Sequence, residues 1–176
     1  LVDLWGVVHN GRIPYPNVLE SMQRLRSGGT DIVFLSNSPR RKQAVAEQLN
    51  EIGVPNDTYD HLVTSGELVF AALEHRAKCR GARSFYPIAP AGTDYLTNDL
   101  SDHREENLYS ADYLLVIGPS DDASDRVEDY CSVLTIAAAR SLPMVCANPD
   151  HYVMRGQQQV LCAGAIAAAY AELGGA

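Results

Sequence analysis

Positive charge is scarce in this sequence. Lysine occurs only at Lys42 and Lys78, and Lys and Arg total 14 against 22 Asp and Glu, which leaves a formal net charge of -8. This balance argues against nucleic acid or an anionic membrane as the main partner, because both surfaces are negatively charged. The patterns G-x-G-x-x-G and G-x-x-x-x-G-K-[ST] are absent, so the phosphate cradle of a nucleotide-binding Rossmann domain is missing. An anionic substrate would need a local trap, such as a metal ion or helix N-termini.

Cysteine and long apolar runs are also rare. No two cysteines form a C-x-x-C pair, and no histidine stands at zinc-ligand spacing. We therefore expect buried free thiols in a reducing compartment, and a cytoplasmic location. The longest apolar stretch, 160–171, is too short to span a bilayer. With 46% hydrophobic residues, the 176 residues suit one globular domain or slightly more. The four cysteines are Cys79, Cys131, Cys146 and Cys162.

Apolar runs alternate with segments of helical spacing along the whole chain. This alternation predicts an α/β fold with a largely parallel sheet. A capping box at Asn17 and Glu20 opens the first expected helix, and Ser38-Pro39 is typical of an N-cap and first turn for the second. The expected strands cover residues 1–8, 31–36, 62–64, 84–88, 113–118 and 143–147, and the expected helices 17–28, 38–53, 124–140, 162–173 and a segment from 65.

The most informative stretch is Asp3-Leu4-Trp5-Gly6-Val7-Val8, an apolar run that opens into a Gly/Pro-rich loop. Ligands of parallel α/β sheets bind at the carboxyl ends of the strands. Asp3 and Ser36 both fall at such ends, and a carboxylate there can act as a nucleophile when a metal ion offsets its charge. The stretch therefore indicates phosphoryl-transfer chemistry.

Taken in order, several short motifs resemble the haloacid dehalogenase superfamily, and within it the NagD-like phosphatases. The motifs are Asp-Leu-x-Gly-Val at residue 3, Ser36-Asn37-Ser38, Thr64-Ser65-Gly66-Glu67, the strand 114–118, Ala147-Asn148-Pro149-Asp150 and the small-residue helix from Cys162. The resemblance implies a partial Rossmannoid parallel-sheet core with an inserted α/β cap. Residues 1–61 would form the amino-terminal part of the core, 62–150 the cap, and 151–176 the return toward the core.

The resemblance also implies a Mg²⁺-dependent phosphomonoester hydrolase that acts on a small phosphorylated metabolite, such as a sugar phosphate or a nucleotide. Asp3 would be the nucleophile and a Mg²⁺ ligand, and the main-chain carbonyl of Trp5 a second ligand. Ser36 and Asn37 would bind the transferring phosphate. In the cap, Asn148 and Asp150 would contact the substrate, and homodimerisation would occur through the cap.

Two features depart from that family. Trp5 stands where the family carries the Asp that protonates the leaving group, and such general acid–base help is typically worth about 10²–10⁴ in rate. The Lys and the acidic metal-binding loop expected after the cap are missing, because no Lys and only one acid, Glu172, follow Asp150. We therefore expect an amino-terminal portion of a longer enzyme. The alternative function is a phosphate-binding homologue with weak or no turnover.

Four parts of the sequence leave alternatives open. The segment 118–122, Gly-Pro-Ser-Asp-Asp, follows a strand and could form an acidic metal loop, but a solvated helix N-terminus fits it better. His9 lies near the expected site and either replaces the lost acid or is a solvated loop residue. Arg40 and Arg41 either attract a phosphorylated substrate or are exposed helix charges. Trp5 either packs at a cleft wall or stacks on the substrate.

Overall fold

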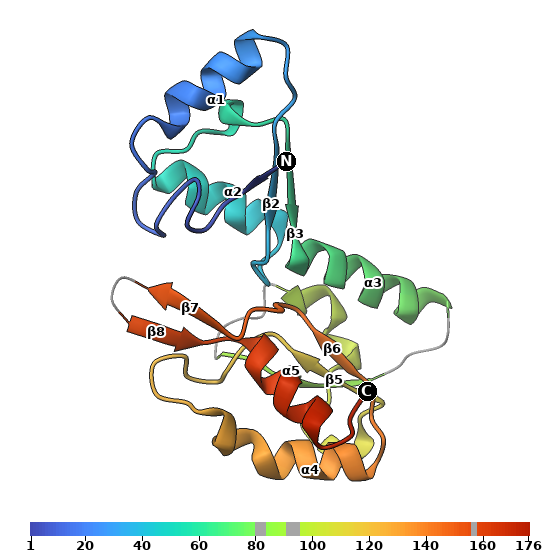
Figure 1. Cartoon of the computed structure of the whole chain (residues 1–176). Coiled ribbons are helices and arrows are strands. Elements are labelled where there is room, and N and C mark those ends of the chain that lie inside the picture. The colour runs from blue at the N-terminus through green and yellow to red at the C-terminus, as the bar shows by residue number, and fades with distance from the viewer. Residues whose placement is uncertain (80–83, 91–95, 156–157) are drawn as a thin grey trace. The chain divides into compact units, whose positions relative to one another are not determined.

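The computed structural model describes residues 1–79, 84–90, 96–155 and 158–176. The chain divides into two compact units, Leu1–Leu68 and Val69–Ala176. Each unit contains a parallel three-stranded sheet with helices packed against it (Figure 1). The predicted α/β class with parallel sheets is confirmed.

The sheet of the first unit has the order β1-β2-β3. Its strands are β1 (Val2–Asp3), β2 (Val33–Ser36) and β3 (His61–Thr64), all parallel, and its helices are α1 (Val18–Ser27), α2 (Lys42–Glu51) and the 3₁₀ turn η1 (Asn56–Thr58). Phe34 of β2 is fully buried among side chains of both α-helices, which lie on one face of the sheet (Figure 1). The core of this unit is formed by Leu4, Val8, Met22, Ile32, Phe34, Val45, Leu49 and Val54.

The second unit holds a sheet of order β4-β5-β6. Its helix α3 (Ser65–Cys79) begins in the first unit. The other elements are β4 (Phe85–Ile88), η3 (Asn98–His103), η4 (Leu108–Ser110), β5 (Tyr113–Val116), η5 (Val127–Tyr130), α4 (Cys131–Ala139), β6 (Met144–Cys146), β7 (Tyr152–Arg155), β8 (Gln158–Leu161) and α5 (Ala163–Glu172).

The central strand β5 is buried along its whole length, as a strand covered on both faces must be. Leu114 and Val116 pack with residues of α4 and α5, whereas Tyr113 and Leu115 pack with α3 and with Leu96 and Leu100. Side chains alternate between the two faces of a strand, so one short strand serves two core clusters. Antiparallel β7 and β8 form a separate hairpin.

Several predicted boundaries and caps are wrong. The first strand is only Val2–Asp3, because the chain turns immediately after Leu4, whose carbonyl accepts three backbone N–H bonds. Asn17 has φ 64 and no side-chain cap, so the predicted capping box with Glu20 does not form. Helix α2 begins at Lys42 rather than after Ser38, since residues 38–41 form a loop.

Three further differences concern the second unit. The expected helix 124–140 is divided into η5 and α4. The hairpin β7–β8 was not predicted, because the alternation of apolar and polar residues in its two strands is weak. Of the cysteines whose side chains are described, Cys162 is buried but Cys131 is exposed, so the expectation of buried thiols is wrong for Cys131.

Helix α5 contributes Ala163, Ile166 and Tyr170 to the same core cluster as β5 and α4. The contacts therefore group residues 163–172 with the second unit, and the assignment of 1–61, 62–150 and 151–176 to core, cap and return stays a prediction. Within the described ranges, no helix has the length and apolar character needed to cross a membrane.

Candidate active site

Two of the predicted site residues meet at one edge of the first sheet. Asp3 is the last residue of β1 and lies beside Leu35 on β2, and Ser36 is the last residue of β2. Adjacent strands are about 4.8 Å apart, so the two residues lie near each other at the carboxyl edge of the sheet, with Ser36 one residue beyond the strand partner of Asp3. Thr64 ends β3 and pairs with Ser36, which extends this edge to a third strand.

The carboxylate of Asp3 is exposed. Among the residues that the structure describes, none donates a hydrogen bond to this carboxylate or forms an ion pair with it. A strand-end carboxylate that is not engaged by its own protein is available to a cation or to an electrophile. This is the arrangement that a nucleophilic carboxylate requires.

The loop after β1 packs tightly around Trp5. The indole ring lies against Gly11, where an added Cβ would come within 2.5 Å of the Trp5 ring, and Gly11 has φ +90. The ring of His9 meets the indole edge-on, with 5.5 Å between centroids. Trp5 still remains 40% exposed. One part of the indole therefore packs on the loop, and whether the exposed part stacks on a substrate stays open.

The main-chain oxygen of Trp5 is a second candidate metal ligand. The backbone bonds of this turn run to Leu4 and His9 carbonyls instead, and no hydrogen bond to the Trp5 oxygen occurs in the described part of the chain. Together with the Asp3 carboxylate it offers two hard oxygen donors, the ligand type that Mg²⁺ prefers, and Mg²⁺ commonly keeps several waters. The residues present fit a magnesium ion, although no group of three or more His, Cys, Asp or Glu side chains gathers within the described residues.

His9 serves the loop rather than proton transfer. It is 5% exposed, and its Nδ1 accepts a hydrogen bond from the Gly11 N–H at 2.9 Å. Burial lowers the pKa of His9, and the nearby negative charge of Asp3 opposes this shift only in part. An Nδ1 that accepts from an N–H places the imidazole in its neutral form with the proton on Nε2.

The predicted phosphate contacts are Ser36 at the end of β2 and Asn37 in the following loop, residues 37–41. The Ser36 hydroxyl accepts a hydrogen bond from the Ser38 N–H at 3.2 Å, and the Ser38 hydroxyl accepts from the Arg40 N–H at 3.3 Å. These short-range bonds tighten the loop, and Asn37 directly follows Ser36 at the carboxyl end of β2. The phosphate roles of Ser36 and Asn37 stay predictions.

Arg40 and Arg41 have partners within the protein. The Arg40 guanidinium donates to Gln48 Oε1 at 3.0 Å, and Arg41 Nε donates to Glu67 Oε2 at 2.8 Å. The Arg41 hydrogen bond is the main cause that lowers the pKa of Glu67. Arg41 is thus neither a freely exposed helix charge nor a free substrate-attracting group.

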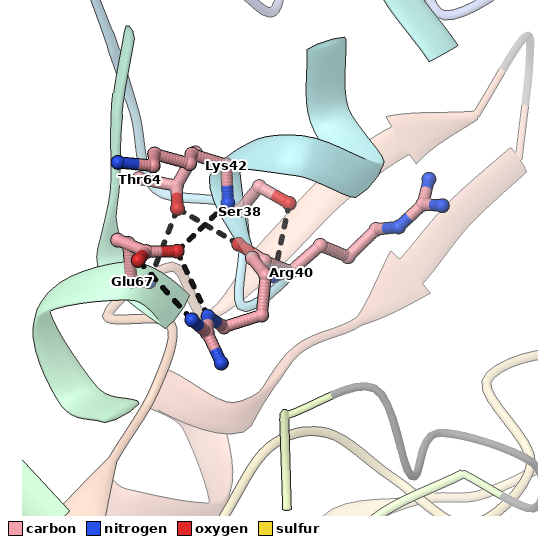
Figure 2. Close-up of polar contacts among 6 residues, drawn as sticks. Ser38, Arg40, Lys42, Thr64 and Glu67 are labelled. Atoms are coloured by element: carbon pink, nitrogen blue, oxygen red, sulfur yellow. Dashed lines mark hydrogen bonds and ion pairs between the residues drawn. The ribbon is translucent and has the colours of Figure 1, made fainter. Parts of the chain in front are cut away.

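Sequence reasoning missed Thr64 and Glu67 as part of this region. Thr64 Oγ1 accepts from the Glu67 N–H at 3.1 Å, as the pattern Thr-x-x-Glu at a helix start would indicate. The Glu67 side chain, however, turns to the loop after β2 instead of reaching back to Thr64 (Figure 2). The pattern could have identified the cap, but not the partner.

The predicted cap residues belong to the second unit. Asn148 is buried, and its Oδ1 accepts from the Asp150 N–H at 3.0 Å, which makes a turn after β6. Their proposed contact with substrate stays a prediction. In the segment 118–122, Asp121 accepts from Ala123 and Ser124, and Asp122 pairs with Arg155 at 2.6 Å. These acids are bonded within the protein, and the segment is not a helix N-terminus, contrary to our preferred interpretation.

Comparison with known proteins places the chain among haloacid dehalogenase-like proteins. A family model described as haloacid dehalogenase-like hydrolase matches residues 1–101. A haloacid dehalogenase-like hydrolase from Brucella suis is 35% identical, with a TM-score of 0.88 over 98% of this chain and 62% of its own. A p-nitrophenyl phosphatase from Archaeoglobus fulgidus is 23% identical, with a TM-score of 0.66 over 99% of this chain and 64% of its own.

A glycerol phosphate phosphatase from Mycobacterium tuberculosis, in complex with magnesium, shares the fold at 20% identity, with a TM-score of 0.68 over 98% of this chain and 50% of its own. The chain thus spans less than two thirds of the length of these structures. No curated protein matches the chain.

Proposed function

The chain belongs to the haloacid dehalogenase-like hydrolase family, and on that basis we propose that it is a Mg²⁺-dependent phosphomonoester hydrolase. The observation that carries the proposal is the carboxylate of Asp3 at the carboxyl end of β1, next to the strand that ends at Ser36; no described residue donates a hydrogen bond to this carboxylate or forms an ion pair with it. Solved structures named as phosphatases share the fold, which supports the same reaction class.

In the proposed reaction, an Asp3 carboxylate oxygen attacks phosphorus and forms a phospho-aspartate. The ester P–O bond breaks, and the leaving oxygen takes a proton from solvent. Water then attacks the phosphorus of the acyl phosphate, so that inorganic phosphate leaves and the carboxylate is restored. Ser36 and Asn37 hold the phosphoryl oxygens during both steps.

Magnesium would be held by the Asp3 carboxylate and the Trp5 carbonyl oxygen. When bound, the ion neutralises charge on the phosphoryl oxygens. Trp5 itself supplies no proton, because an indole N–H is not an acid near neutral pH. The proposal therefore predicts slow hydrolysis of alkyl esters such as sugar phosphates and nucleotides, and faster hydrolysis of phosphate esters whose leaving group departs without prior protonation. Good leaving groups are those whose conjugate acids have a low pKa.

A phosphate-binding homologue without turnover is the second candidate. It is favoured by the indole of Trp5, which occupies the acid position and packs on Gly11. In this case the pocket at Asp3 and Ser36 would bind phosphate and release it unchanged.

The first test compares the wild type with Asp3→Asn, using p-nitrophenyl phosphate and Mg²⁺. Asn is nearly the same size but cannot form the acyl phosphate. We expect kcat/KM to fall on the order of 10³-fold or more, as for loss of a covalent nucleophile. Wild-type phosphate binding without hydrolysis would favour the binding homologue. Hydrolysis that persists in Asp3→Asn would refute the Asp3 mechanism.

Further parts of the proposal concern substrate choice and assembly. The cap, residues 62–150, would select the substrate through Asn148 and Asp150, among sugar phosphates and nucleotides. Homodimerisation through the cap and a cytoplasmic location accompany this proposal. The free thiols of Cys131, Cys146 and Cys162 support a reducing compartment.

A further inference from the structure

The loop after β2 rests on the first turn of α3. Thr64 is fully buried, and its hydroxyl donates to the Arg40 carbonyl at 2.8 Å while it accepts from the Glu67 N–H. One side chain therefore joins the end of β3, the start of α3 and the main chain of the loop (Figure 2).

Glu67 adds a second tie between α3 and the loop. Its Oε2 accepts from Arg41 Nε at 2.8 Å and from the Lys42 N–H at 3.2 Å, and its Oε1 accepts from Arg41 Nη2 at 3.3 Å. The side chains of Arg41 and Glu67 are 28% and 26% exposed. The carboxylate thus holds both a side chain and the first backbone N–H of α2, and so determines where the loop ends.

Gly66 completes the contact at backbone level. Its N–H donates to the Ser38 carbonyl at 3.0 Å. A Cβ at this position would lie 2.1 Å from the Pro39 carbonyl oxygen, a distance that no side chain tolerates. Only glycine lets the loop backbone approach the helix so closely.

We propose that Thr64, Gly66 and Glu67 form a seat that positions the loop 37–41, and that Glu67 is a positioning residue for phosphate binding at Ser36 and Asn37. This inference rests on the proposed function, since it assigns the loop to phosphate. Glu67 acts through Arg41 and Lys42. Hydrogen bonds to phosphate depend on geometry, and misplacement by about 1 Å can cost on the order of 10²-fold.

The first unit contains a matched control at the opposite edge of the same sheet. Asp60 precedes β3, forms an ion pair with Arg26 at 2.7 Å, and accepts the Ile32 N–H at 2.7 Å. Its side chain and that of Arg26 are 27% and 34% exposed. Asp60 therefore resembles Glu67 in bonding and exposure, but lies at the amino ends of the strands, away from Asp3 and Ser36.

The experiment measures binding of inorganic phosphate in the presence of Mg²⁺ by titration calorimetry, together with thermal unfolding, for Glu67→Ala, Glu67→Gln and Asp60→Ala. We expect Glu67→Ala to raise the phosphate Kd about 10-fold. We expect Glu67→Gln, which keeps one acceptor, to recover most of the affinity. Asp60→Ala should lower the unfolding temperature comparably but leave the phosphate Kd unchanged.

Where turnover of p-nitrophenyl phosphate is measurable, Glu67→Ala should raise KM with little change in kcat. This result is expected when a mutation weakens binding of the substrate and of the transition state equally. Ser36→Ala separates the two hypotheses. If it leaves the phosphate Kd unchanged, the proposed phosphate site is wrong and the positioning role fails with it. If it weakens phosphate binding while Glu67→Ala behaves like Asp60→Ala, only the positioning role is overturned.

Discussion

Two loops of this molecule, one in each unit, follow a parallel strand and rest on a glycine at the second position of a helix. After β2, the Gly66 N–H donates to the Ser38 carbonyl at 3.0 Å; after β6, the Gly164 N–H donates to the Asp150 carbonyl at 3.0 Å. A Cβ on either glycine would lie 2.1 Å from a proline carbonyl oxygen, that of Pro39 or Pro149. Both contacts are made by main chain alone.

The loops differ in what side chains add. The loop after β2 is bonded to its helix by Thr64 and Glu67, and in the turn after β6 the Asn148 side chain accepts a hydrogen bond from the Asp150 N–H. Both units thus use a glycine in the first turn of a helix to let a loop backbone pack closely against that helix. In the loop after β2, the charged side chain of Glu67 adds to the glycine contact. We propose that this loop binds phosphate, and mutations can separate the effect of the glycine contact from that of the side-chain bonds.

The largest expected effect comes from replacing the glycines. In an open helix, Gly→Ala stabilises by about 1 kcal/mol, but here the methyl group would displace backbone. We expect Gly66→Ala and Gly164→Ala each to destabilise by about 3 kcal/mol, measured by urea unfolding. Only Gly66→Ala should also weaken phosphate binding. A neutral or stabilising effect at Gly66 would contradict the close approach.

A smaller effect is expected from Thr64→Val. Valine keeps the shape of the side chain but leaves the Arg40 carbonyl and the Glu67 N–H without their partner. We expect this change to lower the free energy of unfolding by about 1–3 kcal/mol. Asn148→Ala, which removes the turn bond after β6, should cost about 1 kcal/mol. Chemical denaturation of both variants compares the two loops, and equal costs would mean that the Thr64 bonds add nothing beyond an ordinary turn.

The smallest expected effect is the loss of stability at acidic pH when the Glu67 carboxylate is protonated. The Arg41 hydrogen bond holds the pKa of Glu67 below its ordinary value of about 4.3. The stabilisation by the charged carboxylate is therefore complete above about pH 4.3 and is lost as the pH falls through the lower, folded-state pKa. It amounts to less than about 1 kcal/mol, because the pair is partly solvated.

The measurement is the difference in unfolding free energy between wild type and Glu67→Gln at pH 7 and at pH 3. We expect this difference to shrink at pH 3. The corresponding difference for Asn148→Ala should stay constant, since an amide does not titrate. A Glu67→Gln difference that is the same at both pH values would show that the carboxylate charge does not tie the loop.

Sequence patterns located the end of β2 well enough to select Ser36, and they selected Asp3 although the strand predicted over residues 1–8 ends at Asp3 in the structure. They did so because a change from apolar run to Gly, Pro or Asn is a local signal. They failed at Asn17, whose side chain was expected to cap α1 but whose backbone has φ 64. They also failed at Ser38, because the bonds to Thr64 and Gly66 hold residues 38–41 outside the helix.

The sequence by itself determined the α/β class and the order of most strands and helices, though not the β7–β8 hairpin, and it selected Asp3 and Ser36, because periodicity and turn chemistry act over a few residues. Only the tertiary structure decided that Glu67 binds Arg41, 26 residues away, and that the loop after β2 packs closely against Gly66. Such contacts depend on how β2 and β3 pair and where α3 starts. No local pattern encodes these distances.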